Sequence, residues 1–313
     1  MIKIGISSCL LGENVRYDGG HKLDRYLRDI FGRFVEWVPV CPEVECGLPV
    51  PREAMRLVGK TNAPRLMTRG TGIDHTPRMQ KWSQKKLSLL ANEQLCGFIF
   101  KSRSPSSGMQ GVKVYPETGQ PSNKGIGLFA SAFMDIFPEI PVEDDGRLHD
   151  ADIRENFIER VFVFHRWKKL NIKNKTIKNL VDFHTDHKLL LMSHSPEHLT
   201  ELGKHVAQAK DQPPHTVFES YFSTLMDALR LKATVKKNVN VLHHMMVYFK
   251  KRPSSDENQE LLDIIEHYHQ GLTPLIVPVT MLNHYVRKYD VSYLKRQVYL
   301  NPHPMELMLR NHV

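Results

Sequence analysis

The sequence has no long apolar run. No stretch of its 313 residues approaches the ~20 apolar residues that a membrane-spanning helix needs. The chain opens with a short strand-like segment, IKIGIS at residues 2–7, and lacks the longer apolar run and cleavage site of a secretory signal. We therefore expect a cytoplasmic protein without a membrane segment.

Cysteine is scarce, and no two cysteines form a Cys-x-x-Cys pair. The sequence therefore gives no indication of a zinc ribbon or a thioredoxin-type motif. The four cysteines all lie in the N-terminal third: Cys9, Cys41, Cys46 and Cys96. Because disulfides are disfavoured in the cytosol, such clustering favours metal binding or catalysis. The alternative for any one of them is the role of a small buried hydrophobic residue.

Dense runs of lysine and arginine are absent, as are internal repeats and low-complexity tracts. The formal net charge is nevertheless +9, spread along the chain. This excess is consistent with an anionic partner such as a nucleotide or nucleic acid. A slightly basic, solvated surface is the more common cause of such an excess.

In the first half of the chain, strand-like segments alternate with helical patterns. Short runs rich in β-branched residues predict strands at 2–7, 35–40 and 97–101, with a fourth candidate at 112–115. Helical patterns lie at 21–31 and 77–94. The alternation predicts an α/β domain over residues 1–140, a parallel sheet with flanking helices. In such sheets the loops at the carboxyl ends of the strands carry the ligand site.

The second half of the chain has a different hydrophobic periodicity. A segment rich in proline and acidic residues predicts a linker at 141–150. Beyond it, residues 151–313 have helical periodicity without strand-like alternation, which predicts an all-helical domain. The helical patterns lie at 151–171, 174–192, 196–209, 214–251, 256–270, 278–289 and 303–311.

Residues whose side chains can react or bind a metal follow the predicted strands directly. Cys9 and Cys41 each come just after a strand, and Glu43 lies two positions beyond Cys41. The loop after the third strand is rich in serine, including Ser104 and Ser107. Because the carboxyl ends of parallel strands meet at one edge of a sheet, these groups could converge on one point.

These loops carry a resemblance to a known family. The segments CLLGENVRYDGG, VPVCPEVECGLPVPRE and KSRSPSSGMQGVKVY resemble the thiouracil desulfidase family. The second half resembles a YbgA-like domain of unknown function, through stretches such as RENFIERVFVFHRWKKL and LVDFHTDHKLLLMSHSP. The two resemblances together cover nearly the whole chain.

The first resemblance implies a [4Fe–4S] cluster held by three cysteines, with one iron open to the sulfur of a thiolated uracil. Cys9 and Cys41 match two of the ligands. Glu43 matches the catalytic acid/base, and Ser104 matches a serine that assists proton transfer. The implied substrate is a small thiolated nucleobase or nucleoside, and RNA is a further candidate partner.

The third ligand position departs from the family. The family motif reads Ser-Pro-Ser-Cys-Gly, and the residue at the cysteine position here is Ser107. Thiolate is the normal ligand of an iron–sulfur cluster, and a serine hydroxyl is a harder ligand with a higher pKa. Three outcomes stay open: Ser107 ligates as an alkoxide, Cys46 or Cys96 replaces the missing cysteine, or the cluster has been lost.

Basic residues of the same loops are candidates for substrate positioning. Arg16, Arg52 and Lys101 could hold a phosphate or a base carbonyl, or they could be solvated loop charges. The leading hypothesis is a desulfidase. The competing hypothesis is a non-catalytic protein that has lost the cluster and binds nucleotides or nucleic acid.

Overall fold

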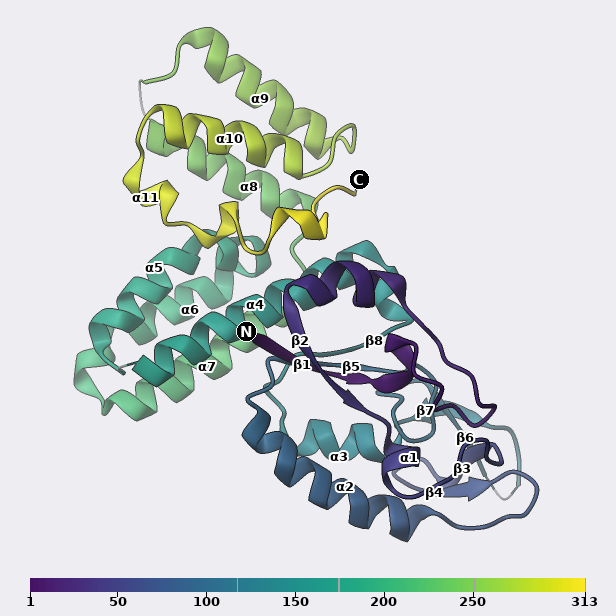
Figure 1. Ribbon diagram of the computed structural model, residues 1–313. Coiled ribbons are helices and arrows are strands. Elements are labelled where there is room, and N and C mark those ends of the chain that lie inside the picture. The colour runs from purple at the N-terminus through teal and green to yellow at the C-terminus, as the bar shows by residue number, and fades with distance from the viewer. Residues whose placement is uncertain (117, 174, 250–251, 313) are drawn as a thin grey trace. The chain divides into compact units, whose positions relative to one another are not determined.

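The computed structural model describes residues 1–116, 118–173, 175–249 and 252–312 (Figure 1). The chain divides into two compact units, Met1–Asp150 and Ala151–Val313. Strands occur in the first unit, and the described part of the second unit consists of helices and their connections. The predicted fold class, α/β followed by all-α, is therefore confirmed.

A four-stranded parallel sheet forms the centre of the first unit. Its order is β2-β1-β5-β8, with β1 at Ile2–Ser7, β2 at Val35–Val40, β5 at Gly97–Phe100 and β8 at Val142–Asp144. The first three strands confirm the strand predictions at 2–7, 35–40 and 97–101. Glycine is required within β1, because a Cβ atom on Gly5 would lie 2.2 Å from the Phe98 ring of the neighbouring strand.

The segment predicted as a linker at 141–150 contributes the edge strand β8 instead. Phe98 of β5 pairs with Val142, and Phe100 pairs with Asp144. Glu143 and Asp144 are buried. The acidic residues that suggested a solvated linker are thus part of the first unit, because the sheet edge and the nearby Arg147 supply partners for them.

A second sheet, which the sequence analysis did not predict, lies in the same unit. Its order is β4-β3-β6-β7, with β3 at Met55–Lys60, β4 at Ala63–Thr68, β6 at Val112–Tyr115 and β7 at Ser122–Gly125. The β3–β4 and β6–β7 pairs are antiparallel, whereas β3 and β6 run parallel. The fourth predicted strand, 112–115, therefore exists but belongs to this mixed sheet.

Two helices cover a face of the parallel sheet. These are α2 at Thr76–Leu90 and α3 at Leu128–Ile136, which pack against one another and against the sheet (Figure 1). Phenylalanines form the centre of this core: the Phe98 and Phe133 rings lie 4.7 Å apart between centroids. The predicted helix at 21–31 is reduced to a π-helical turn, Tyr26–Ile30, followed by a 3₁₀ turn at Phe31–Arg33.

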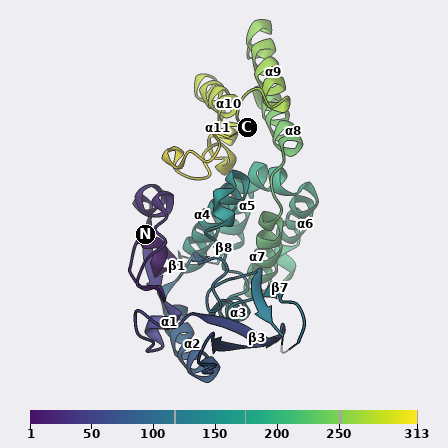
Figure 2. The same cartoon turned by 90° about the vertical axis from the view of Figure 1, so that its right-hand side faces the viewer.

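The second unit is a set of α-helices joined by short connections (Figure 2). The helices are α4 Ala151–Lys173, α5 Ile177–His194, α6 Pro196–Ala207, α7 Pro214–Arg230, α8 Val235–Met246, α9 Ser255–His269, α10 Ile276–Lys288 and α11 Ser292–Lys295. The pattern at 214–251 is two helices, because Thr234 begins α8 as an N-cap that accepts a hydrogen bond from the Lys237 amide. Residues 174 and 250–251 of the predicted helices lie outside the described residues.

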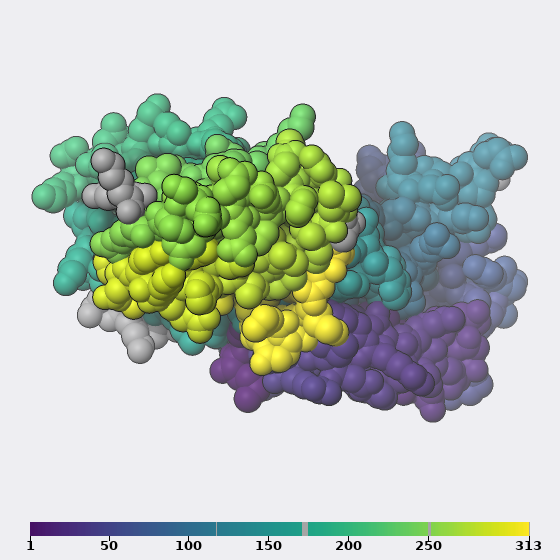
Figure 3. All heavy atoms as spheres, turned by 90° about the horizontal axis from the view of Figure 1, so that it is seen from above, coloured from purple at the N-terminus to yellow at the C-terminus, as the bar shows by residue number. Residues whose placement is uncertain are grey.

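Aromatic side chains build the core of this unit. Trp167 of α4 stacks on Tyr221 and Phe222 of α7, with centroid distances of 5.4 and 5.3 Å. Helix α10 packs against α8 and α9, and the space-filling view shows the yellow C-terminal residues next to green residues of the same unit (Figure 3). No helix in the described residues is both long and apolar enough to cross a membrane.

Candidate functional site

The loops at the carboxyl ends of β1, β2 and β5 surround one cavity of about 1240 Å³. Its lining includes eight of the nine residues that the sequence singled out: Cys9, Arg16, Cys41, Glu43, Arg52, Lys101, Ser104 and Ser107. They come from segments up to about a hundred positions apart in the sequence, and the parallel sheet brings them to one edge.

The two strand-end cysteines are buried in the wall of this cavity. Cys9 and Cys41 are each 8% exposed. Burial raises the pKa of Cys9 to about 11, although the charge of Lys101 opposes the shift. Burial, reinforced by the negative charge of Glu43, raises the pKa of Cys41 to about 12. Both side chains are therefore thiols at neutral pH unless a bound metal supplies compensating positive charge.

Cys46 lies outside the cavity. Its thiol donates to the backbone carbonyl of Glu43 at 3.2 Å, and its side chain packs against the cluster that contains Leu48 and Met55. The sequence had suggested that Cys46 could replace the missing ligand because it shares a loop with Cys41. The structure separates the two cysteines, because the one-turn helix α1, Pro42–Glu45, stands between them and turns Cys46 to its other side.

Cys96 is also outside the cavity. It is 2% exposed, and its thiol lies 3.8 Å from the Gln94 carbonyl, before strand β5 begins. That end of β5 is opposite to the end that carries the serine-rich loop. Neither alternative cysteine therefore occupies the third ligand position.

Glu43 is held by serine hydroxyls. The Ser106 hydroxyl donates to Glu43 Oε1 at 2.5 Å, and the Ser104 hydroxyl lies 3.5 Å from the same oxygen. The second oxygen, Oε2, lies 3.9 Å from the Arg52 guanidinium and 3.7 Å from the Cys41 thiol. Ser106 was not predicted as a site residue, although it lies in the serine-rich loop between Ser104 and Ser107.

The serine-rich loop is rigidly braced. Ser104 Oγ accepts hydrogen bonds from the backbone amides of Ser106 at 3.3 Å and Ser107 at 3.1 Å. The loop packs closely around Gly108, where an added Cβ atom would lie 2.8 Å from the Ser104 carbonyl. Ser107 is 3% exposed, and its hydroxyl lies 3.4 Å from that of Ser106. Ser107, at the position that the resemblance assigns to the third ligand, therefore has a fixed place in the lining of the cavity that also contains Cys9 and Cys41.

The three basic residues predicted to position the substrate line the cavity and already have protein partners. Arg52 donates to the Val15 carbonyl at 3.0 Å and so ties the first loop to the second. Lys101 pairs with Asp145 at 2.8 Å, and Arg16 pairs with Asp18 at 3.2 Å. Their role in substrate binding stays a prediction.

The cavity as a whole is strongly basic. Nine lysines and arginines line it, against two carboxylates: Arg16, Lys22, Arg52, Arg56, Arg69, Lys101, Arg103, Lys113 and Arg147 against Glu43 and Asp144. The net charge of the entire chain is only +9. Three of the nine, Arg16, Lys101 and Arg147, pair with carboxylates outside the lining, namely Asp18, Asp145 and Glu143. The remaining basic side chains still outnumber Glu43 and Asp144, which favours an anionic ligand.

The donor set matches that of an iron–sulfur cluster in number, with one change of atom, and its members line one cavity. Cys9, Cys41 and Ser107 come from three different loops and line the same cavity. Two of them offer sulfur and the third offers a hydroxyl oxygen. Since iron–sulfur clusters are ordinarily held by thiolates, a cluster on this set would be bound less firmly than on three cysteines.

Comparisons with known proteins identify relatives of both halves of the chain. Residues 4–145 match the family model of 2-thiouracil desulfurase, and residues 188–304 match that of DUF1722, a protein family of unknown function. The uncharacterized protein YbgA of Escherichia coli (strain K12) is 29% identical over 153 residues, which cover 49% of this chain and 90% of YbgA. The uncharacterized protein YbbK of Bacillus subtilis (strain 168) is 30% identical over 108 residues, which cover 33% of this chain and 71% of YbbK.

One solved structure is similar to part of the chain. It is described as the [4Fe–4S]-dependent thiouracil desulfidase TudS, with 28% identity and a TM-score of 0.39, over 48% of this chain and 95% of TudS. The resemblance predicted from the loop sequences is confirmed by the family models: the chain belongs, through residues 4–145, to the 2-thiouracil desulfurase family and carries a DUF1722 region at residues 188–304.

Proposed function

We propose that the first unit is a desulfidase that replaces the sulfur of a thiouracil-type base by oxygen. The observation that carries the proposal is the convergence of Cys9, Cys41, Glu43 and Ser107 on one basic cavity. The overall reaction consumes one water and releases one hydrogen sulfide. It is redox-neutral, so it needs no further electron donor.

Cys9, Cys41 and Ser107 would hold the cluster. When bound, it would supply an iron without a protein ligand, a Lewis acid that is a soft partner for the substrate's sulfur. The buried thiols lose their protons on metal binding, because the cation compensates the charge that burial disfavours.

Glu43 is the proposed acid/base. Its carboxylate lines the cavity, within hydrogen-bond range of Ser106 and close to Cys41. It can take a proton from the attacking water and return it to the departing sulfur. Ser104 and Ser106 keep the carboxylate in place, and Ser104 also fixes the loop that presents Ser107.

The basic residues that line the cavity favour a substrate that carries phosphate. A free thiouracil is uncharged and would use few of the nine basic side chains, whereas a thiolated nucleotide or an RNA would pair with several of them. We therefore propose a phosphate-bearing thiolated nucleotide or RNA as the substrate class, with the free base or nucleoside as a weaker substrate.

Anaerobic reconstitution with iron and sulfide tests the proposal. The wild-type chain should gain the visible absorbance of a cluster, contain about four irons for a [4Fe–4S] cluster, and release sulfide from a thiouridine substrate. Glu43→Gln should keep the cluster and lose sulfide release. A reconstituted chain that contains iron but releases no sulfide from a base, a nucleoside, a nucleotide or an RNA would contradict the proposal.

The second candidate function is non-catalytic binding of nucleotides. It is favoured by one observation: the two cysteines that could replace the third ligand, Cys46 and Cys96, both lie outside the cavity. In that case the wild-type chain would not retain iron, whereas Ser107→Cys would. Binding of a nucleotide would persist without iron and weaken steeply with salt, because phosphate contacts dominate it.

A further inference from the structure

The helical unit contains a cavity of its own, of about 350 Å³. All the residues that line it belong to the second unit. The lining residues that matter below are Glu155, Glu159, His194, Tyr268, Thr273 and Arg310. Small-molecule sites usually have volumes of roughly 300–1,000 Å³, so this cavity has room for a single heterocycle with its substituents.

A buried charged network forms one wall of the cavity. Arg310, whose side chain is 5% exposed, donates to Glu159 at 2.9 Å and to Glu155 at 3.2 Å. His194 lies 3.1 Å from the second oxygen of Glu159, and its other ring nitrogen lies 2.6 Å from the Leu231 carbonyl. Both ring nitrogens of His194 thus face oxygen atoms of the protein. The buried cation of Arg310 therefore balances the negative charge of Glu159 inside the protein.

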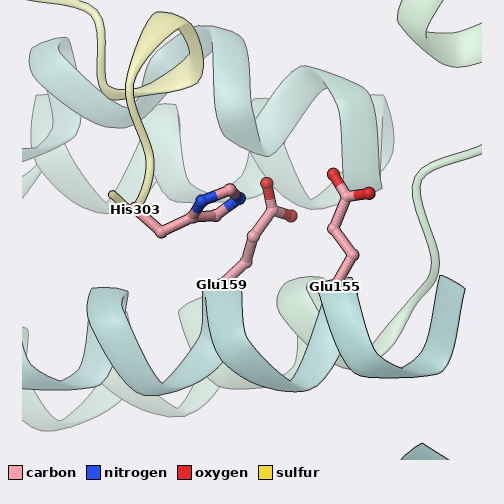
Figure 4. A group of neighbouring side chains, drawn as sticks. All are labelled: Glu155, Glu159 and His303. Carbon is pink, nitrogen blue, oxygen red and sulfur yellow. The ribbon is translucent and has the colours of Figure 1, made fainter. Parts of the chain in front are cut away.

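This balance argues against a metal ion at the same carboxylates. Figure 4 shows Glu155 and Glu159 one turn apart on α4, with the His303 ring directed toward Glu159, and one ligand atom of each lies within 4.8 Å of the others. A divalent cation there would meet the buried guanidinium of Arg310, which already bonds both carboxylates. The network leaves little negative charge for a metal to neutralise.

Three groups in the cavity keep unused hydrogen-bonding capacity. Burial and the adjacent negative charge of Glu159 raise the pKa of Glu155, which favours the carboxylic acid, a group that both donates and accepts. Tyr268 accepts a hydrogen bond from Asn238 at 3.2 Å and keeps its own proton to donate. Thr273 Oγ1 is buried and has no partner among the described residues. A buried hydroxyl without a partner is costly unless a ligand or a water satisfies it.

We propose that this cavity binds a small uncharged molecule with a cis-amide edge, an N–H group beside a carbonyl, as in uracil. The Glu155 carboxylic acid can pair with such an edge through two hydrogen bonds, accepting from the N–H and donating to the carbonyl. The hydroxyls of Tyr268 and Thr273 line the same cavity and are available to a further carbonyl. The helical unit would then have a ligand of its own, and this does not depend on the desulfidase chemistry proposed for the first unit.

Isothermal titration of the full-length chain with uracil tests this proposal. Glu155→Leu, which removes both hydrogen bonds, should weaken uracil binding about tenfold or more, and Thr273→Val about 3- to 10-fold. Glu155→Gln is the matched control, because a primary amide also donates and accepts side by side, and it should bind within about 3-fold of wild type. The compound 1,3-dimethyluracil, which lacks the N–H, should not bind.

Several results would overturn the proposal. One is the absence of uracil binding to the wild-type chain, and another is equal binding of 1,3-dimethyluracil. A third is uracil binding that is unchanged in Glu155→Leu but lost in Glu43→Ala, since the ligand would then lie in the first unit. Thermal unfolding of each variant checks that the helices are intact. Sulfide release is measured separately, so a failure of the desulfidase proposal does not affect this result.

Discussion

The thiol of Cys46 donates a hydrogen bond to the backbone carbonyl of Glu43, with 3.2 Å between Sγ and O. Cys41 and Cys46 stand at opposite ends of the one-turn helix α1, the first as its N-cap and the second as its C-cap. Cys41 therefore lies beside the carboxylate of the catalytic candidate Glu43 in the cavity lining. Cys46 lies outside the cavity and bonds the Glu43 backbone.

We expect Cys46→Ala to leave iron binding and sulfide release close to wild type. The variant loses one weak hydrogen bond and some packing, a cost of about 1 kcal/mol in the free energy of unfolding. Cys41→Ala is the matched comparison and should abolish iron binding. Iron content after anaerobic reconstitution checks both variants. A loss of iron in Cys46→Ala equal to that in Cys41→Ala would mean that Cys46 is a ligand after all.

Ser107→Cys should bind the cluster more firmly than the wild type, because it restores the thiolate that the family motif has at this position. The measurement is the rate at which a chelator removes iron from each reconstituted chain. A slower loss is expected for the variant. Identical rates in the two chains would show that the third ligand is not at position 107.

Ser106→Ala should lower the rate constant for desulfidation about 10- to 100-fold with little change in KM, because Glu43 loses the hydrogen bond that fixes it. The matched control is Ser122→Ala, which removes a hydroxyl from β7 that donates to no catalytic candidate. The iron content of Ser106→Ala should equal that of wild type. An unchanged rate constant would contradict a positioning role for Ser106.

The helical unit should lose stability in acid through His187. Burial lowers the pKa of this imidazole to about 3, from an ordinary value of 6.5, although its hydrogen bond to the Phe183 carbonyl opposes the shift. Between pH 6.5 and pH 3 the His187 side chain is therefore protonated in the unfolded chain but not in the folded chain. The resulting stability is present above pH 6.5 and is lost as the pH falls toward 3, by at most about 1.4 kcal/mol per pH unit.

Urea unfolding between pH 7 and pH 4 measures this effect. His187→Gln should show a smaller loss of stability over that range than the wild type. His215→Gln, a change at an exposed histidine on α7, is the control and should follow the wild type. Parallel curves for wild type and His187→Gln would contradict the assignment.

The sequence predicted the elements whose periodicity is uninterrupted. The runs at 2–7 and 35–40 are strands with the same bounds, because buried β-branched residues and flanking turns mark their ends. The β3–β4 hairpin was missed, although Met55 and Leu57 alternate with less buried neighbours, because lysines and arginines interrupt the apolar pattern. Strand β8 was missed for a related reason, since its acidic residues resemble those of a solvated linker.

The sequence by itself determined which donor atoms this protein has: two strand-end cysteines, a glutamate two positions beyond one of them, and a serine in the place of a third cysteine. Only the tertiary structure decided which of them meet. Parallel strands bring Cys9, Cys41 and Ser107 to one cavity, although they are far apart in sequence. The five-residue step across α1 carries Cys46 away from Cys41, because at about 100° per residue it leaves the two positions about 140° apart around the helix axis.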